Sequence, residues 1–520
     1  MIHLSSRLWY NNFVMTLYET LEKYTSTDVY PFHMPGHKRR AAHMCDPAAI
    51  DITEIDGFDN LHHACGILRE AEERAASLYS SSETHFLVNG STCGVLAAIG
   101  ACTSPGGHIL MARNSHRSAF NAVWLNRLRC SYLYPAVPDS RSGYCTARTF
   151  LLYSDRNGPV DPLQVEQAFN AHSGIQAVFL TSPAYDGVVS DIRKIAEIAH
   201  RHGTPLIVDE AHGAHFGMHS IFPESSVKLG ADLVIHSLHK TLPALTQTAL
   251  IHVNGDLVDR GRLRQMLSVY QTSSPSYVLM ASIDRCIRLL ADEGPDLFSA
   301  YAQRLENFYA GTQLKHLSFL KTDDPSRILI SPKAVKISGD ISGAELYHIL
   351  RERFHLQPEM AAPSYVLMLS SVCDDDEGFA RLRDALLTLD HEYGGSEDVR
   401  SVSGDGSMAA RSVSGDDSEA RHTAASAEKN ASDASLQPDI CCTISEALDS
   451  ASRPVPFAEA EGSVCAEFLT MYPPGVPLLV PGERIRAGSI RTALKLREQG
   501  YSLQGPEDYS LRQIKVLCRR

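Results

Sequence analysis

Short runs of apolar residues alternate with amphipathic stretches between residues 75 and 255. The apolar runs have the length and composition of buried strands: THFLV (84–88), HILMA (108–112), AVFLTS (177–182), PLIVDEA (205–211), LVIHS (233–237) and TALIHV (248–253). Residues 191–203 repeat apolar residues at helical spacing and end in Gly203, which suits the position after a helix. Strands that alternate with helices predict a mainly parallel sheet with helices on both faces.

A second, smaller domain is expected to begin near residue 296. Two strand-like runs and a helical pattern indicate it: RILIS (327–331), YVLML (365–369) and GAELYHILRERF (343–354). The predicted organisation has three parts: an N-terminal segment with the motif HMPGHK over residues 1–44, a large domain over 45–295 and a small α/β domain over 296–520.

Residues 394–438 differ in composition from the rest of the chain. Ser, Gly, Ala, Asp and Glu dominate, and RSVSGDGSMAA (400–410) is followed at once by the near-repeat RSVSGDDSEAR (411–421). Such a segment cannot bury enough apolar surface to offset its chain entropy. We expect a disordered insertion that interrupts the small domain, with a regulatory loop as the alternative.

The overall composition narrows the class of protein. With 520 residues, 44% of them hydrophobic and 21% charged, the chain has the make-up of a globular protein. Its formal net charge of −13 disfavours a nucleic-acid partner, because binding to nucleic acid depends on neutralising phosphates. No apolar run is long enough for a transmembrane helix and no secretory signal is evident, so a cytoplasmic location is expected. The 12 cysteines form no C-x-x-C pair, which favours reduced thiols.

The segment LIVDEAHGAH (206–215) is compatible with three kinds of site. Asp209-Glu210-Ala211-His212 is spelled like a helicase motif, but a helicase also needs a P-loop and the dipeptide Gly-Lys occurs nowhere. A metal site could use four histidines: His212, His215, His236 and His239. No cysteine or carboxylate completes a recognisable ligand spacing around them, so no metal site is predicted. In the third interpretation, Asp209 ends a buried strand and holds a proton on a bound ring cofactor.

Two further segments favour the cofactor interpretation. Gly90, Ser91 and Thr92 lie between a strand and a helix, where backbone N–H groups can bind a phosphate, although Ser and Thr also serve as ordinary helix caps. Lys240 follows a buried strand and is either a surface lysine or an amine that reacts with an aldehyde cofactor. A phosphate cup, a reactive lysine and the Asp209 carboxylate together indicate pyridoxal 5'-phosphate (PLP).

The motifs as a set resemble those of the Orn/Lys/Arg decarboxylases. The resemblance is carried by VDEAHGAH (208–215) with SLHKTLPALTQTA (237–249), and by YPFHMPGHK (30–38), DNLHHACGIL (59–68), FLVNGST (86–92), ARNSHRSAF (112–120), TSPAYDGVVSDI (181–192), TSSPSY (272–277) and YPPGVPLLVPGE (472–483). It covers nearly the whole chain outside the insertion, in the family's order. The form resembled is the short one of Gram-positive bacteria, closest in look to arginine decarboxylase. The implied fold class is α/β: the aspartate-aminotransferase-like PLP fold type I, with a mainly parallel sheet in the large domain.

The resemblance assigns roles to individual residues. Lys240 is expected to hold PLP covalently, Asp209 to pair with the pyridine nitrogen and His116 to stack on the ring. His212 is expected near the ring, without a defined role. The phosphate is expected among seven residues: Gly90, Ser91, Thr92, Ser237, His239 and, on a loop of the partner subunit, Thr272 and Ser273. That shared loop implies a homodimer, and a higher homo-oligomer is compatible with it.

The implied reaction is decarboxylation of a basic amino acid, which feeds polyamine synthesis. Arginine is the favoured substrate, and lysine or ornithine is the alternative; an aminotransferase or another PLP lyase of the same fold also remains open. A cationic substrate needs an acidic or polar group at the end of its pocket. Three carboxylates near the matching segments are candidates for this group: Asp59, Asp186 and Glu359.

Overall fold

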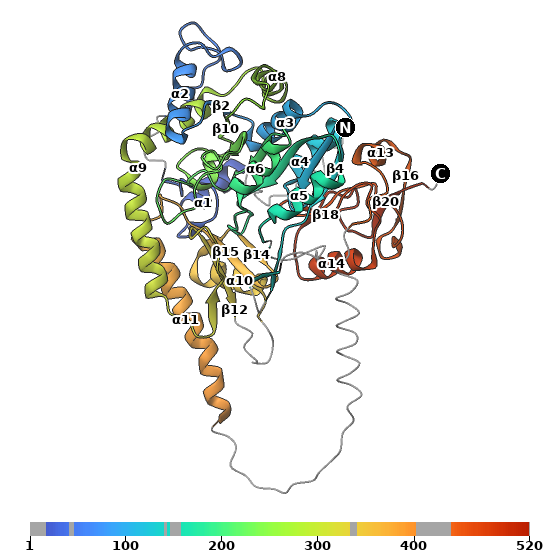
Figure 1. Ribbon diagram of the computed structural model, residues 1–520. Helices are drawn as coiled ribbons and strands as arrows, with labels where there is room; N and C mark the ends of the chain where they lie inside the picture. Colours follow the sequence, from blue (N-terminus) through green and yellow to red (C-terminus); the bar gives the residue numbers. More distant parts are fainter. Residues whose placement is uncertain are drawn as a thin grey trace, which may run out of the picture.

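The computed structural model describes residues 17–40, 46–139, 143–145, 156, 158–332, 341–401 and 438–518. Figure 1 shows a large domain built around one sheet, a small domain below it and a C-terminal unit at its side. The short helix α1 (Leu17–Thr25) precedes the N-terminal strap, the name used here for residues 30–40. Within the described parts of the chain, no helix is long and apolar enough to cross a membrane.

A seven-stranded sheet forms the centre of the large domain. Its order is β2-β10-β9-β8-β7-β3-β4, and β10 alone runs antiparallel to its neighbours. The strands are β2 (Glu83–Leu87), β3 (His108–Ala112), β4 (Arg129–Leu133), β7 (Ile175–Thr181), β8 (Leu206–Asp209), β9 (Leu233–His236) and β10 (Ala249–Val253). Six of these were predicted as strands. The edge strand β4 was missed because its sequence, RCSYL, is half-exposed and lacks a continuous apolar run.

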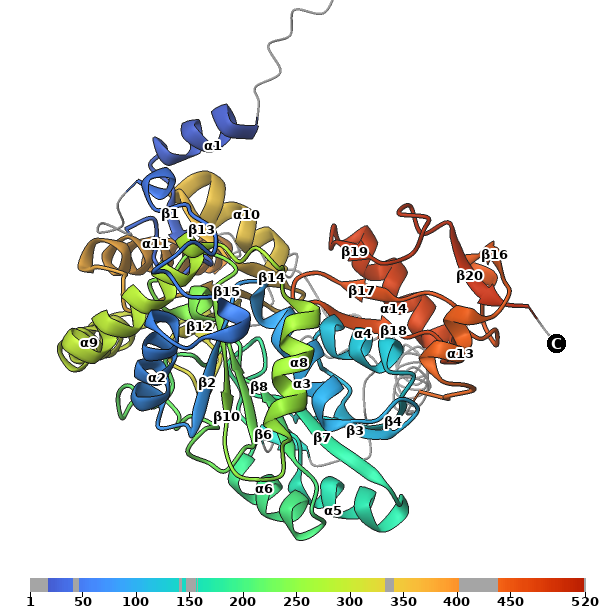
Figure 2. The same cartoon turned by 90° about the horizontal axis from the view of Figure 1, so that it is seen from above.

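Helices cover both faces of this sheet, as the alternating pattern predicts (Figure 2). One face carries α3 (Gly90–Cys102), α4 (Arg117–Leu125) and α8 (Arg260–Tyr270), and the other carries α5 (Pro162–Ala171) and α6 (Ile192–Arg201). Helix α6 matches the predicted helix. It begins after Asp191, whose side chain accepts from the Lys194 N–H, and it is followed by Gly203 at φ +65°. The remaining elements of the large domain are η1 (Pro47–Ala49), η2 (Leu61–His63), α2 (Ile67–Tyr79), β5 (Val137–Asp139), β6 (Gly143–Cys145) and α7 (Leu238–Thr241).

The predicted boundary at residue 296 falls inside a continuous helix, α9 (Tyr277–Gly311). Gly294 and Pro295 mark a break in the sequence pattern, but the helix continues through them. Apolar side chains on both sides of this point, among them Leu290 and Phe298, are buried in one core. This packing outweighs the local preference of proline for a helix end.

The small domain follows α9 and contains a four-stranded sheet. Its elements are β11 (Leu317–Phe319), β12 (Arg327–Pro332), α10 (Gly343–Phe354), β13 (Leu356–Pro358), β14 (Met360–Ala362), β15 (Tyr365–Leu369) and α11 (Asp376–Ser401). The predicted strands and helix of this region are present. Helix α11 runs beyond residue 394, where the insertion was expected to begin, and residues 402–437 lie outside the described part of the chain.

Residues 438–518 form a separate C-terminal unit with its own core. Its elements are α13 (Ile444–Asp449), β16 (Ser452–Pro456), η3 (Phe457–Glu459), β17 (Leu469–Met471), β18 (Val476–Leu479), α14 (Ala487–Glu498), β19 (Leu503–Gln504) and β20 (Gln513–Leu517). The expected single domain over 296–520 is therefore two bodies, on different sides of the large domain (Figure 1). The C-terminal unit is fastened to the large sheet by a buried ion pair, in which Arg113 Nη2 lies 3.2 Å from Glu483 Oε2.

The N-terminal strap joins the large and small domains. Its strand β1 (Tyr30–Phe32) pairs in parallel with β13 of the small domain. Further along, the Gly36 N–H donates to the His239 carbonyl oxygen of the large domain at 2.7 Å. A Cβ atom at Gly36 would lie 2.7 Å from the Leu242 nitrogen, so only glycine permits this approach. The buried Lys38 donates to the Leu369 carbonyl oxygen at 2.6 Å and fixes the strap to β15.

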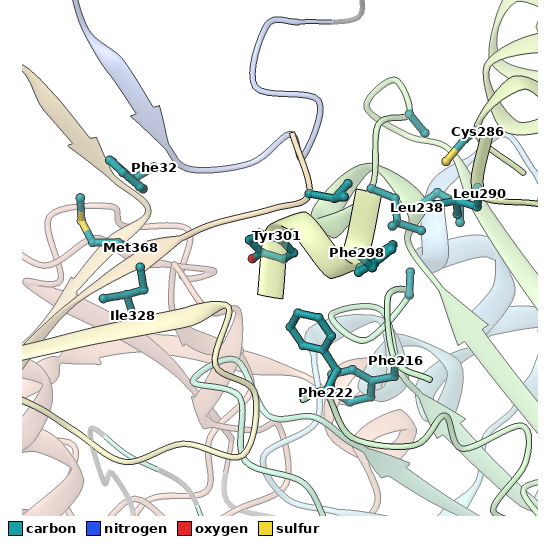
Figure 3. Packing of buried hydrophobic residues seen from close by; sticks show 14 of the residues in the cluster. Phe32, Phe216, Phe222, Leu238, Cys286, Leu290, Phe298, Tyr301, Ile328 and Met368 are labelled. Atoms are coloured by element: carbon teal, nitrogen blue, oxygen red, sulfur yellow. The ribbon is translucent and has the colours of Figure 1, made fainter. Parts of the chain in front are cut away.

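One apolar core extends across the strap, the large domain and the small domain (Figure 3). Phe32 of the strap, Leu238 of α7, Tyr301 of α9 and Met368 of β15 all belong to it. The short helix that carries Lys240 is therefore anchored by Leu238 in the same core that holds the two domains together.

Candidate active site

A cavity of about 670 Å³ opens at the carboxyl ends of the large sheet's central strands. Its wall combines residues of the strap, the large domain, the small domain and the C-terminal unit: Met34, Pro35, Gly90, Ser91, Thr92, Asn114, His116, Thr181, Ala184, Tyr185, Asp209, Ala211, His212, His239, Lys240, Thr246, Gln247, Glu359, Tyr472, Pro473, Pro474 and Val476. Eight of the predicted site residues are in this set. Ligands of parallel sheets bind at this edge because the strand ends and their loops converge there.

Lys240 projects into the cavity from α7, directly after β9. Its Nζ lies 3.0 Å from His212 Nε2. Burial lowers the pKa of Lys240, the positive charge of Arg327 lowers it further, and the nearby carboxylates Asp209 and Glu359 oppose the shift. A lysine with a lowered pKa carries more of the neutral amine, which is the form that attacks an aldehyde.

Asp209 lies at the end of β8, where the preceding buried residues of the strand fix its position. Its Oδ1 accepts from the Ala211 N–H at 3.2 Å. Burial raises the pKa of Asp209, and the positive charge of Lys240 counteracts this rise. The structure thus brings Asp209 and Lys240 to one cavity, as the sequence predicted.

His116 lies across the cavity at the start of α4. Its Nδ1 accepts from the Ser118 N–H at 3.2 Å, which caps the helix and fixes the ring. Burial, with Lys240 and Arg117 nearby, lowers the pKa of His116 to about 4, so the ring is neutral at neutral pH. Gly475 of the C-terminal unit approaches this ring so closely that an added Cβ would lie 2.8 Å from Cδ2.

His212 is held between the large and small domains. The fully buried Arg327 donates from Nη2 to its carbonyl oxygen at 2.7 Å, and the ring of Tyr185 lies 4.6 Å away. Burial and the positive charge of Lys240 lower the pKa of His212 well below its ordinary value. His212 is therefore a neutral imidazole within hydrogen-bonding distance of the amine.

Gly90, Ser91 and Thr92 form the first turn of α3 on the cavity wall. No side chain caps this turn, and Gly90 adopts φ +73°. The exposed N–H groups at a helix N-terminus, together with the helix dipole, favour an anion. His239 also lines the wall and donates from Nδ1 to the Thr248 carbonyl oxygen at 2.9 Å; burial lowers its pKa to about 4.

The other predicted phosphate residues lie outside this cavity. Ser237 is fully buried beside α7, and its hydroxyl has no hydrogen-bond partner among the described residues. Thr272 and Ser273 are exposed. The Thr272 N–H donates to Asn89 Oδ1 at 3.3 Å. The loop therefore lies on the surface beside Asn89, the residue before the Gly90–Thr92 turn. The structure does not bring Thr272 and Ser273 into the cavity of their own chain.

Of the three candidate substrate carboxylates, only Glu359 lines the cavity. Asp59 instead accepts backbone N–H groups at the start of α2, for example from Gly66 at 2.8 Å. Although burial acts to raise the pKa of Asp59, these bonds lower it to about 2. Asp186 is buried and lies 3.6 Å from Arg156. Glu359 accepts from the Met34 N–H at 2.9 Å and from the Tyr185 hydroxyl.

Several wall residues were not predicted from the sequence. Asn114 and Thr181 are notable because Asn114 Oδ1 and Thr181 Oγ1 are buried without a hydrogen-bond partner in the described chain. Tyr185, Gln247 and Tyr472 also line the cavity. Thr181 is the last residue of β7, and Asn114 lies two residues after the end of β3. Their positions at the carboxyl ends of buried strands were the signal in the sequence that could have identified them.

The four histidines considered for a metal site do not converge. His215 Nε2 lies 3.2 Å from Asp324, whereas His236 Nε2 lies 2.8 Å from Glu210. In the part of the chain that the structure describes, no group of three potential ligands could hold a metal ion.

Comparisons with known proteins agree with this geometry. Residues 15–330 match a family model described as Orn/Lys/Arg decarboxylase, major domain, and residues 426–501 match the C-terminal domain of the same family. An arginine decarboxylase of Bacillus subtilis (strain 168) is 28% identical over 522 residues, which cover 96% of this chain and 97% of the relative.

Solved structures share the fold. The lysine decarboxylase LdcF of Francisella novicida aligns with a TM-score of 0.70 at 18% identity and covers 96% of this chain and 80% of that one. A structure of SPT with PLP aligns with a TM-score of 0.51 at 13% identity and covers 71% of this chain and 88% of that one. The predicted fold class, PLP fold type I with a mainly parallel sheet, is confirmed.

The lowered pKa of Lys240 predicts its chemical reactivity. In wild-type protein, reductive methylation of Lys240 should reach its half-maximal rate below pH 10.4, about the ordinary lysine pKa. In Asp209→Asn the midpoint should move to still lower pH, because the lost negative charge no longer stabilises the ammonium. Mass spectrometry of the peptide carrying Lys240 gives both midpoints, and exchange of the exposed Asp256 for asparagine is the control. A midpoint at or above that of ordinary lysine contradicts the argument.

Proposed function

The chain belongs to the Orn/Lys/Arg decarboxylase family, and from this premise we propose that it removes CO₂ from arginine with bound PLP, giving agmatine. The observation that carries the proposal is the convergence of Lys240, Asp209 and His116 on one cavity beside an uncapped helix N-terminus. We propose further that the reaction takes place in the cytoplasm and supplies an amine to polyamine synthesis.

The residues of the cavity fit PLP. The first turn of α3, with Ser91 and Thr92, is suited to the phosphate, and the Thr181 hydroxyl, which has no hydrogen-bond partner among the described residues, can donate to a ligand or accept from it. Lys240 is suited to the aldehyde carbon and Asp209 to the ring nitrogen. When bound, PLP supplies an electron sink for the electron pair left behind when CO₂ departs.

The protein's own contribution is orientation and control of protons. The Asp209 carboxylate would hold a proton on the ring nitrogen, and the neutral His116 ring offers a flat, uncharged face for stacking. Lys240 Nζ and His212 Nε2, at 3.0 Å, can share or pass a proton once the amine is released. Decarboxylation requires a defined orientation of the bond that breaks, which residues of the cavity wall can impose.

Glu359 is proposed as the acceptor for the positive end of the substrate side chain. It is the carboxylate on the wall besides Asp209, and it comes from the small domain, across the cavity from the large sheet. Tyr185 and the Met34 N–H fix its orientation by hydrogen bonds. A guanidinium needs a well-oriented carboxylate more than an ammonium does, because it binds through a planar pair of donors.

A homodimer with shared active sites is also proposed. Thr272 and Ser273 are exposed on their own chain, so they are available to the phosphate site of a second copy. Their loop follows α8 and precedes the long helix α9, which gives it a rigid support.

The cofactor assignment predicts one covalent adduct. Borohydride treatment of the PLP-loaded protein should fix PLP on Lys240, and Lys240→Ala should lose both the adduct and turnover. Asp209→Asn should keep the adduct but lose most of its activity, since an amide cannot stabilise the ring proton. Peptide mapping identifies the modified lysine, and an adduct on any other lysine overturns the assignment.

The substrate assignment predicts a change in KM. Glu359→Gln should raise KM for arginine by roughly ten- to a hundredfold, because one partner of a charged hydrogen bond is lost, while PLP binding is unchanged. Glu352→Gln, an exposed position in the same domain, is the matched control. Chromatography of the amine products tests the substrate itself: faster release of cadaverine than agmatine at equal substrate concentration shows that arginine is the wrong choice.

The shared site predicts complementation between two inactive variants. Lys240→Ala and a variant with alanine at both Thr272 and Ser273 should each be inactive or weak alone. Mixed and reassembled, they should regain up to about a quarter of wild-type activity, because hybrid dimers contain one intact site. Activity assays with sedimentation analysis test this, and a monomer that is fully active at high dilution excludes it.

A further inference from the structure

A row of hydrogen-bonded polar side chains crosses the large sheet from the end of β8 to the edge strand β2. It begins at Glu210, the residue after Asp209, whose Oε1 lies 2.8 Å from His236 Nε2 on β9. His236 Nδ1 lies 3.0 Å from His252 Nε2 on β10, and His252 Nδ1 lies 2.8 Å from Thr84 Oγ1 on β2. Glu210, His236, His252 and Thr84 are called the polar row below.

The polar row is completely enclosed. Glu210 and Thr84 are 1% and 2% exposed, and both imidazoles are fully buried. The ring of Tyr79 packs over His236 and His252, with centroids 4.8 and 4.7 Å away. Burying polar groups is unfavourable, and apolar residues of similar size often fill a core at lower cost. On β9 and β10 the residues next to the two histidines are isoleucine and valine (Ile235, Ile251 and Val253), so filling the core does not explain the polar row.

Both ends of the polar row are held by further hydrogen bonds. The Glu210 carboxylate accepts from Ser225 Oγ at 2.7 Å and from the Ser226 N–H at 2.8 Å. At the other end, Ser81 Oγ lies 2.7 Å from Thr84 Oγ1. A carboxylate only accepts, so His236 Nε2 donates to Glu210, His252 Nε2 donates to His236 Nδ1, and the Thr84 hydroxyl donates to His252 Nδ1. A complete row has one preferred geometry.

The polar row connects the two segments that carry the reactive residues. Glu210 directly follows Asp209, and His236 is separated from Lys240 only by Ser237 and the first turn of α7. The side chains of Glu210 and His236 face away from the cavity. The hydrogen bond between them therefore links the chain segment that carries Asp209 to the segment that carries Lys240.

We infer that the polar row is a positioning network that fixes the distance between Asp209 and Lys240. Glu210, His236, His252 and Thr84 touch neither substrate nor cofactor in this arrangement and act through the two cavity residues. The inference rests on the proposed function, because the distance between Asp209 and Lys240 matters only if both residues act on the same bound cofactor. Fixed supporting residues keep reacting groups in register, and their loss typically reduces activity by about ten- to a hundredfold.

Thr84→Val tests the inference, because valine keeps the shape of threonine and removes only the hydroxyl group. Thr103→Val is the matched control: Thr103 is also buried, and its hydroxyl donates to the Ile99 carbonyl oxygen at 2.6 Å, outside the polar row. In cofactor-free protein labelled with ¹⁵N-histidine, Thr84→Val should shift the imidazole signals of His236 and His252, and Thr103→Val should not. This measurement needs neither cofactor nor substrate, so its result stands even if the proposed reaction is wrong.

In PLP-loaded protein, Thr84→Val should lower kcat by about tenfold with KM nearly unchanged, because the row orients reacting groups and does not bind substrate. The absorption band of the bound cofactor should shift as well, and Thr103→Val should change neither quantity. Glu210→Gln, which breaks the other end of the row, should give the same pattern and serves if Thr84→Val folds poorly. Equal kcat for Thr84→Val and Thr103→Val, or imidazole signals that do not respond to Thr84→Val, overturns the inference.

Discussion

Lys240 is only partly exposed and its amino group lies inside the cavity, and much of the surrounding structure serves this constraint. A buried ammonium is unfavourable unless charges and hydrogen bonds compensate it. Here the carboxylates of Asp209 and Glu359 stabilise the charged form, whereas burial and Arg327 favour the neutral amine. The neutral His212 is the immediate hydrogen-bond partner. These opposing effects allow a reactive amine to lie inside the cavity without an uncompensated charge.

Closing such a site requires more than one domain. The strap reaches the Lys240 helix at Gly36, where no side chain would fit, and Lys38 fixes the strap to the small domain. On the other side, the buried pair of Arg113 and Glu483 holds the C-terminal unit against the sheet, which brings Gly475 onto the His116 ring. The cavity thus forms only when the strap, the small domain and the C-terminal unit pack against the large domain. These contacts use buried polar groups, which would be left unpaired if the parts separated.

The segment DEAHGAH (209–215) shows how one strand end can serve several environments. Asp209 and His212 face the cavity, Glu210 enters the polar row, and His215 pairs with the buried Asp324 next to Arg327. Asp324 and Arg327 belong to the start of β12 and its preceding turn, so His215 links the large domain to the small one. The charged and histidine residues of a motif that can be read as a helicase or a metal site are thus explained by three separate environments: the cavity, the polar row and the contact with the small domain.

The sequence by itself predicted the central strands and helix α6, and placed Asp209 and Lys240 at or just after strand ends; His116 was added only by the resemblance to the family. Periodicity is a local property, and the ends of parallel strands converge at one edge whatever the loops do. Only the tertiary structure decided that α9 continues through Pro295, that residues 438–518 form a separate body, and that Glu359 rather than Asp59 or Asp186 reaches the cavity. It also decided that Glu210, His236, His252 and Thr84 join into the polar row. These outcomes depend on packing between segments far apart in the chain, which no local pattern records.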